Sequence, residues 1–286
     1  MFDWPEDVLE HARRRELVLV IGAGVSQNAQ PIASRRPPGW RDLLKELASR
    51  IGDPELDVEL EELFSQERYL DAAELLRQHA RAKSQEQAVH TQLRRSVDGH
   101  PPNVFTGGEW HEQIVRLEPR VIITTNFDKI LERATNDGYA SHSFDSPTVA
   151  SDVRRGEPVL LKMHGTVDHI ERVVLSRRDY TRLRVDGRPM LEVIQALFLT
   201  RVALFIGYSL RDPDMQLLLE NNFGGTDGPP AHYVLLGDNL PDFEREVLRF
   251  SYGVTPVLYP AGDHDQALGM LRVLADEVEA ARPEIA

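Results

Sequence analysis

Residues 17–26 read LVLVIGAGVS, an apolar run that ends in a glycine-rich turn. Two further apolar runs end in polar residues: residues 121–128 read VIITTNFD, and residues 159–165 read VLLKMHG. Short apolar runs that alternate with helix-like segments are typical of parallel strands joined by crossover helices. Ligands bind outside the carboxyl ends of such strands. The three runs therefore predict one crevice with a glycine loop, an Asn, an Asp and a His, which favours chemistry on a dinucleotide.

The composition narrows the class of protein. The chain has 286 residues, enough for one large domain with a sizeable core. Its formal net charge of −13 argues against a nucleic-acid-binding surface, which needs a concentrated basic face. The absence of cysteine excludes disulfides, thiolate nucleophiles and cysteine zinc sites.

The ends and apolar runs of the chain predict its location. The first seven residues, MFDWPED, lack the basic-then-apolar order of a signal peptide, and the longest apolar runs are too short to span a bilayer. We therefore expect a soluble, cytoplasmic protein with no membrane contact.

The pattern of apolar residues predicts the order of the elements. Residues 7–15 are expected to form a helix before the first strand, and residues 27–39 are expected to form a loop. Helical spacing then dominates residues 40–117. Residues 170–180 are expected to add a small extended piece. Later strands are expected near 120–124, 158–162, 202–206, 232–236 and 254–258, and helices near 127–137, 189–199, 212–222, 242–251 and 264–280.

These elements make one α/β domain over residues 1–286. A Rossmann-like parallel sheet with helices on both faces is expected from residues 1–39 and 118–286. The segment at about 40–117 would be a helical insertion after the first strand, acting as a lid, an interface or a plain structural cap.

Each polar motif has a structural interpretation as well as a functional one. The turn at residues 22–26 could hold a pyrophosphate or simply join a strand to a helix, since it lacks the third glycine of the dehydrogenase fingerprint. Asn126 and Asp128 could cap a helix, and His164 could be a satisfied turn histidine. A fourth strand end reads GYSLRDPD at residues 207–214, where Asp214 is favoured as a helix cap and Asp212 has the same interpretation.

Taken together, the four motifs resemble the sirtuin superfamily. They are most similar to its prokaryotic sirtuin-like branch, which is associated with NAD-degrading effectors of anti-phage defence. The motifs stand in the family's order between residues 17 and about 214, and they comprise residues 22–26 (GAGVS), 124–128 (TTNFD), 162–165 (KMHG) and 207–209 (GYS).

The resemblance implies a role for each matching residue. Asn126 would orient the nicotinamide ribose and an attacking water, and His164 would act as the base on a ribose hydroxyl; these two are the expected catalytic residues. Asp128 would hold the nicotinamide carboxamide. The other residues expected to bind NAD⁺ are Gly22, Ala23, Gly24 and Ser26 at the phosphates, Gly207 and Ser209 on the adenosine side, and Thr125.

Two departures from protein-deacetylating sirtuins shift the expected reaction. Those enzymes carry a four-cysteine zinc module, which a chain without cysteine cannot form, and they usually have Gln where Thr125 stands. We therefore expect an NAD⁺ hydrolase that uses NAD⁺ as its substrate, with no zinc. The alternatives are an NAD-dependent deacylase or ADP-ribosyltransferase, and a module that senses NAD or ADP-ribose without chemistry.

Two further expectations concern charge and control. Local cations must offset the net charge if an anionic substrate binds, and Arg35, Arg36, Arg41 and Lys162 are candidates, although any of them could be solvated surface. Trp40 is expected in the core. The resemblance implies an effector held inactive until triggered, through homo-oligomerisation or a separate partner such as an Argonaute-like protein or a helicase-type ATPase.

Overall fold

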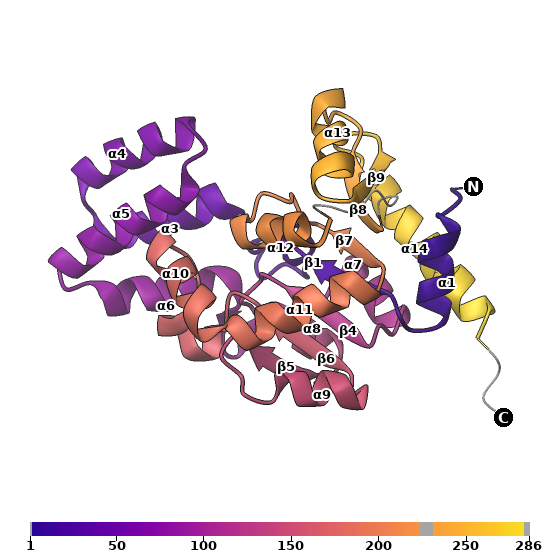
Figure 1. Cartoon of the computed structure of the whole chain (residues 1–286). Helices are drawn as coiled ribbons and strands as arrows, with labels where there is room; N and C mark the ends of the chain where they lie inside the picture. The colour runs from indigo at the N-terminus through magenta and orange to yellow at the C-terminus, as the bar shows by residue number, and fades with distance from the viewer. Residues whose placement is uncertain (1, 224–230, 283–286) are drawn as a thin grey trace.

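The structure, a computed structural model, describes residues 2–223 and 231–282. Its centre is a seven-stranded sheet with the order β5-β6-β4-β1-β7-β8-β9 (Figure 1). Every neighbouring pair in this sheet is parallel. The strands are β1 (Val18–Ile21), β4 (Val121–Thr124), β5 (Ala140–Ser143), β6 (Val159–Lys162), β7 (Ala203–Ile206), β8 (His232–Gly237) and β9 (Val254–Tyr259).

The register of the central strands brings the polar motifs to one edge of the sheet. Ile21 at the end of β1 pairs with Thr124 of β4 on one side and with Ile206 of β7 on the other. Thr124 in turn pairs with Lys162 of β6. Because all four strands end at the same level, the four following loops start side by side. The predicted Rossmann-like α/β fold is confirmed.

Alternate residues of the buried strands face two different helical layers, as the two-residue period of a strand requires. Leu19 and Ile21 belong to a core with one layer, whereas Val18 and Val20 belong to a core with the other. The first layer contains α1 (Glu6–Arg13), α7 (Glu109–Arg116), α8 (Ile130–Ala134) and α14 (His264–Ala280). The second contains α9 (Val149–Arg155), α10 (Arg177–Asp186), α11 (Arg188–Thr200), α12 (Pro213–Phe223) and α13 (Asp242–Ser251).

The segment between β1 and β4 forms a separate helical body that projects to one side of the sheet (Figure 1). It consists of α3 (Trp40–Ile51), α4 (Pro54–Ser65), α5 (Tyr69–Ala82) and α6 (Glu86–Val97), which share their own apolar core. We call these four helices the insertion. A short hairpin of β2 (Gly99–His100) and β3 (Asn103–Val104) follows, and α7 then returns to the sheet. None of the helices in residues 2–223 and 231–282 is long and apolar enough to cross a membrane.

Two expectations about local structure were wrong. Residues 170–180 are not extended: a 3₁₀ turn, η1 (Val167–Arg172), precedes α10. Helix α10 starts there because the Asp179 carboxylate accepts from both the backbone N–H and the hydroxyl of Ser176, each at 2.9 Å. Helix α8 occupies only Ile130–Ala134 of the expected 127–137, because residues 126–128 are held in a loop by their own side chains.

The glycines of two loops allow the ends of β1 and β7 to approach each other closely. Gly24 N–H donates to the Gly207 carbonyl at 3.0 Å, and Gly22 N–H donates to Ile206 O at 3.0 Å. A Cβ on Gly22 would lie 2.3 Å from the Gly207 oxygen, and one on Gly207 would lie 2.6 Å from Val25 N. No side chain larger than hydrogen fits at either position without moving the backbone.

We predict that Gly207→Ala destabilises the fold more than Gly52→Ala. Both glycines have left-handed φ values, +62° and +64°, but a Cβ on Gly52 meets no described atom within 4 Å. The Gly52 variant therefore measures backbone strain alone, about 1 kcal/mol. Gly207→Ala adds a backbone clash, and we expect a total loss of roughly 2–4 kcal/mol in the free energy of unfolding, measured by denaturant titration. Equal losses of unfolding free energy in the two variants would contradict the close approach of the loops after β1 and β7.

We also predict that two buried histidines weaken the fold in mild acid. His111 Nδ1 accepts from Gly108 N–H and His232 Nδ1 accepts from Ala203 N–H, each at 3.2 Å. Burial lowers the pKa of each histidine from 6.5 to about 4. The unfolded chain therefore binds more protons between these values, and stability falls as the pH drops from 6.5 toward 4, by up to about 1.4 kcal/mol per pH unit for each group.

His111→Gln tests this, because Gln at the third helical position can still accept from the N-cap amide. We expect a shallower loss of stability between pH 6.5 and 4.5 than in the wild type, measured by urea titration. The exposed His100→Gln is the matched control and should keep the wild-type slope. If both variants lost stability with falling pH as steeply as the wild type, the assignment of this acid sensitivity to His111 would be contradicted.

Candidate functional site

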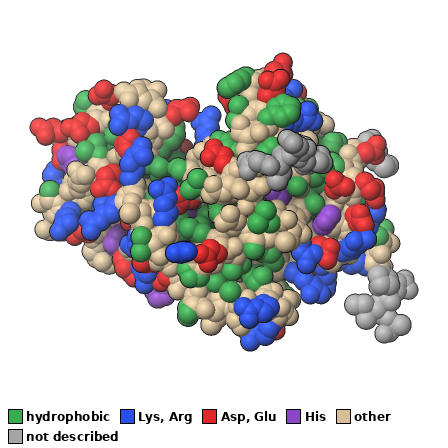
Figure 2. All heavy atoms as spheres, in the orientation of Figure 1, with side chains coloured by type: hydrophobic (Ala, Val, Ile, Leu, Met, Phe, Trp, Pro, Cys, Tyr) green, Lys and Arg blue, Asp and Glu red, His purple; other side chains and the backbone are tan. Residues whose placement is uncertain are grey.

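One cavity of about 1090 Å³ lies along the carboxyl ends of the strands, between the insertion and α13. Figure 2 shows the surface hollowed between these two parts of the molecule. All ten residues expected to bind or act on NAD⁺ line this cavity, although they come from four separate loops: Gly22, Ala23, Gly24, Ser26, Thr125, Asn126, Asp128, His164, Gly207 and Ser209. The geometry thus brings the ten together, and their individual roles are taken up below as proposals.

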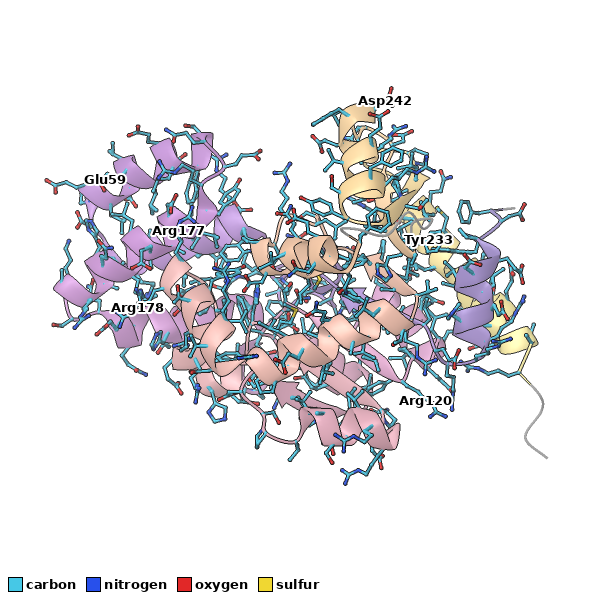
Figure 3. All side chains as sticks on the ribbon, viewed as in Figure 1. Glu59, Arg120, Arg177, Arg178, Tyr233 and Asp242 are labelled. Atoms are coloured by element: carbon cyan, nitrogen blue, oxygen red, sulfur yellow. The ribbon has the colours of Figure 1, made fainter. Side chains whose placement is uncertain are left out.

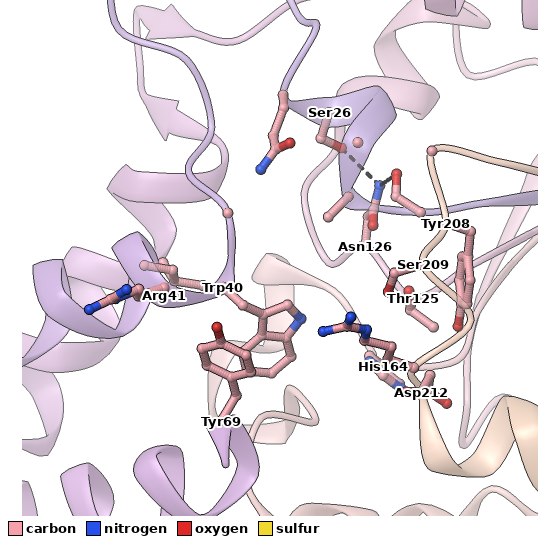
Figure 4. A pocket seen from close by; sticks show the side chains of 18 of the residues that line it. Ser26, Trp40, Arg41, Tyr69, Thr125, Asn126, His164, Tyr208, Ser209 and Asp212 are labelled. Atoms are coloured by element: carbon pink, nitrogen blue, oxygen red, sulfur yellow. Dashed lines mark hydrogen bonds and ion pairs between the residues drawn. The ribbon is translucent and has the colours of Figure 1, made fainter. Parts of the chain in front are cut away.

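Asn126 is fixed in one orientation by two hydrogen bonds from its amide nitrogen. Nδ2 donates to Gly22 O and to Ser26 Oγ, each at 2.9 Å (Figure 4). Ser26 Oγ donates onward to Asp128 Oδ2 at 2.7 Å. Since both amide hydrogens of Asn126 are used inside the protein, its Oδ1 is the atom left to accept a hydrogen bond from a ligand.

Asp128 lines the cavity and contacts a buried group of charges behind it. Its Oδ1 accepts from Ile130 N–H at 3.0 Å, which explains the start of α8. Lys162 Nζ lies 2.7 Å from Glu132 Oε1 and also donates to the Asp128 carbonyl. Burial raises the pKa of the Asp128 carboxyl, and the nearby Lys162 ammonium opposes that rise. Lys162 is 1% exposed, so this expected substrate cation supports the loop from below instead of facing a ligand.

His164 is held between two partners that sequence spacing does not connect. Its Nε2 lies 3.1 Å from Asp212 Oδ2, at ion-pair distance but without the alignment of a strong hydrogen bond. The Tyr180 ring packs edge-on against the imidazole at 5.3 Å, and the Tyr180 hydroxyl donates to Asp212 Oδ2 at 2.5 Å. Figure 4 shows His164 and Asp212 together at the cavity wall. With Nε2 against the carboxylate, Nδ1 is the ring nitrogen left to accept a proton.

Asp212 caps a helix and also contacts His164. The expectation that Asp214 acts as a helix cap was wrong. Asp212 Oδ1 accepts from Met215 N–H at 2.9 Å and so caps α12. Asp214 instead pairs with Arg184, whose Nε lies 2.7 Å from Oδ1. Burial would raise the pKa of Asp212, but the close approach of the His164 ring and hydrogen bonds from the Tyr180 hydroxyl and the Met215 N–H hold it below its usual range. Asp212 therefore stays ionised beside His164.

The arginines that line the cavity are already paired with carboxylates. Arg41 lies 2.8 Å from Glu61 and Arg211 lies 2.7 Å from Glu67. Arg68 and Arg177 both pair with Asp71, and the Arg177 hydrogen bond is the main reason why the pKa of Asp71 is lowered. Figure 3 labels Arg177 where α10 meets the insertion.

Of the four cations expected to offset the charge of a substrate, only Arg41 lines the cavity. Arg35 pairs with Glu46 at 2.7 Å, and Arg36 donates weakly to Gln27 O at 3.5 Å. Trp40, expected in the core, is half-buried: it packs against the insertion core and also lines the cavity beside Tyr69 (Figure 4). Its place at the first turn of α3 puts it at the edge of that core.

Comparison with known proteins agrees with these features. Residues 120–257 match the SIR2-like domain family. The chain is 26% identical over 220 residues to NAD(+) hydrolase ThsA of Bacillus cereus (strain MSX-D12), covering 76% of this chain and 41% of that protein. It is 22% identical over 258 residues to NAD(+) hydrolase ThsA of Enterococcus faecium, covering 86% and 49%. It is 25% identical over 223 residues to Defense-associated sirtuin 2 of Bacillus subtilis, covering 75% and 20%.

The chain spans less than half the length of each of these relatives. The match to the SIR2-like domain covers strands β4 to β8 and most of β9, including the loops of Asn126, His164 and Gly207. The order of the strands places the glycine turn and these loops next to one another, around one cavity. Residues 120–257 of this chain are therefore similar to the SIR2-like domain family.

Proposed function

We propose that this chain hydrolyses NAD⁺ at the nicotinamide–ribose bond, releasing nicotinamide and ADP-ribose or a cyclic form of it. The observation that supports this most directly is that Asn126 Oδ1 and the His164 ring lie in one cavity, beside the glycine turn. A module that only bound the dinucleotide would have no need for either group.

The glycine turn is proposed to receive the pyrophosphate. Gly22 and Gly24 already donate their amides to the end of β7, so their contribution is the absence of side chains, which lets a ligand approach the backbone. The exposed Ala23 amide begins the short helix α2 and is the donor that remains for a phosphate oxygen. Ser209, exposed in the loop after β7, is proposed to add a hydroxyl on the adenosine side of the pyrophosphate.

The proposed reaction needs little acid catalysis. When the C1′–N bond breaks, its electron pair returns to the pyridinium nitrogen, and nicotinamide leaves as a neutral molecule. The site must then stabilise an oxocarbenium-like ribose and direct a water oxygen to C1′. A glycoside hydrolase needs a carboxylic acid to protonate its leaving group, and this reaction does not.

Asn126 and His164 are proposed to meet these two requirements. Asn126 Oδ1 would accept a hydrogen bond from the attacking water and so orient it. His164 Nδ1 would accept a proton from a ribose hydroxyl, and that hydroxyl would take up the proton that the attacking water loses as its oxygen bonds to C1′. Asp212 would stabilise the imidazolium that results. Asp128, which lines the same cavity, is proposed to hold the nicotinamide carboxamide.

We further propose that this activity depletes NAD⁺ as part of anti-phage defence. The relatives support this through their names, NAD(+) hydrolase and defense-associated sirtuin. Because constant NAD⁺ loss would harm the host, control by self-assembly or by a separate regulatory protein fits such an effector. A zinc-dependent deacylase is disfavoured because the 286 residues contain no cysteine for that module.

We predict that Asn126→Ala and His164→Ala each lower nicotinamide release at least about 10²-fold, since a positioned proton acceptor contributes typically 10²–10⁴. The measurement is chromatography of the products after incubation with NAD⁺. His169→Ala changes an exposed histidine outside the cavity and should keep wild-type turnover. All variants should remain folded at the assay temperature, although Asn126→Ala loses two buried hydrogen bonds and should melt at a lower temperature than the wild type. Full activity in both site variants would contradict the catalytic roles proposed for Asn126 and His164.

We predict that Asp212→Asn lowers kcat about tenfold or more and leaves KM nearly unchanged, because Asp212 is proposed to act through His164. Loss of the carboxylate should also change which ring nitrogen of His164 carries the proton. That change is read from the imidazole ¹⁵N chemical shifts of the labelled protein. Because Asn can still cap α12, a wild-type kcat with an unchanged tautomer would show that Asp212 acts only as the cap of that helix.

A further inference from the structure

The order of the strands determines where the second nucleoside of a bound dinucleotide must lie. Asn126 follows β4 and His164 follows β6, both on one side of β1 in the sheet. The glycine turn follows β1 itself. If the reacting ribose lies over β4 and β6 and the pyrophosphate over β1, the adenosine extends across the ends of β7, β8 and β9. This step rests on the proposed function.

The cavity continues in that direction. Beyond Ser209 its wall is formed by the loops after β8 and β9, and we call this part the β8–β9 arm. Leu235 and Tyr259 give it apolar surface suited to a base, and Asn239 supplies an amide. Glu244, exposed in the first turn of α13, is its only carboxylate among the described lining residues.

The β8–β9 arm contains no lysine or arginine among its described lining residues. Arg245, the residue after Glu244, is turned away: its guanidinium donates to the Asp238 carbonyl at 2.6 Å and lies 3.6 Å from Asp242 Oδ1. Figure 3 labels Asp242 at the start of α13. His264, whose ring packs 6.0 Å from Tyr259, is the one basic side chain on the arm's described surface.

This charge pattern matters for the 2′ position of the adenosine ribose. A carboxylate can accept a hydrogen bond from a free 2′-hydroxyl, whereas sites for a 2′-phosphate use arginine. A phosphate monoester carries about −1.5 to −2 charge at pH 7, and a nearby carboxylate repels it. Glu244 forms no ion pair with any described residue, so no described cation offsets its charge at the arm.

We infer that Glu244 makes this site selective for a dinucleotide with a free adenosine 2′-hydroxyl and against one with a 2′-phosphate. The carboxylate favours NAD⁺ by accepting the hydroxyl and rejects NADP⁺ by repulsion, a case of specificity built from an unfavourable contact. Because no catalytic group lies in the arm, the discrimination acts on binding.

Binding of the reaction products tests this without requiring turnover. ADP-ribose and its 2′-phosphate are titrated into the wild type, Glu244→Gln and Glu244→Arg by calorimetry at 0.15 M salt. We expect the wild type to bind ADP-ribose about tenfold more tightly than the 2′-phosphate. Glu244→Arg should reduce that ratio about tenfold, and Glu244→Gln should fall between the two.

Glu246→Arg is the matched control, since it makes the same change of charge on the same helix but outside the cavity. It should keep the wild-type ratio, and so should His264→Gln. Equal wild-type affinity for both compounds, equal effects at residues 244 and 246, or a larger effect of His264→Gln would each overturn the role of Glu244. If neither compound bound, the dinucleotide site itself would be wrong, which is a separate and distinguishable failure.

Discussion

The site depends on the backbone contact between the glycine turn after β1 and Gly207 after β7. Two hydrogen bonds at 3.0 Å hold these loops against each other, and they form only because neither loop carries a Cβ at the points of contact. The Gly22 carbonyl is thereby fixed, and Asn126 Nδ2 donates to it. The orientation of the proposed catalytic amide is therefore a consequence of how two neighbouring strands end.

A buried layer of charge supports this arrangement from below. Lys162 and Glu132 form an ion pair in which each side chain is less than 10% exposed, and Lys162 also binds the backbone of Asp128. Burying such a pair costs desolvation energy that their attraction only partly offsets, so its contribution to net stability is small. Its structural effect is large, because it fixes the loop that contains Asn126 and Asp128 while leaving the cavity surface free of that charge.

The sequence predicts best what is local or periodic. The buried strands β1, β4, β6 and β7 are short apolar runs, and parallel register carries their following residues to one edge, so the ten site residues could be predicted to meet. The contact of His164 with Asp212 could not, because 48 positions separate them and a helix-capping aspartate looks the same in either case. Strand β5, the polar ASHS at the sheet edge, lacks an apolar run. The pairing of the cavity arginines depends on how the insertion lies on the sheet, which no local pattern encodes.

Phe127, the residue between Asn126 and Asp128, has its side chain in the core of the insertion, together with Val167 and Val173 from the chain after His164. The Phe127 carbonyl also accepts from Val167 N–H at 2.8 Å, and Arg94 of α6 donates to Val167 O at 2.6 Å. The insertion is therefore mechanically joined to both halves of the site at once. Any rotation of its helices relative to the sheet would carry the two loops with it, so the distance from the Asn126 amide to the His164 ring reports the position of the whole helical body.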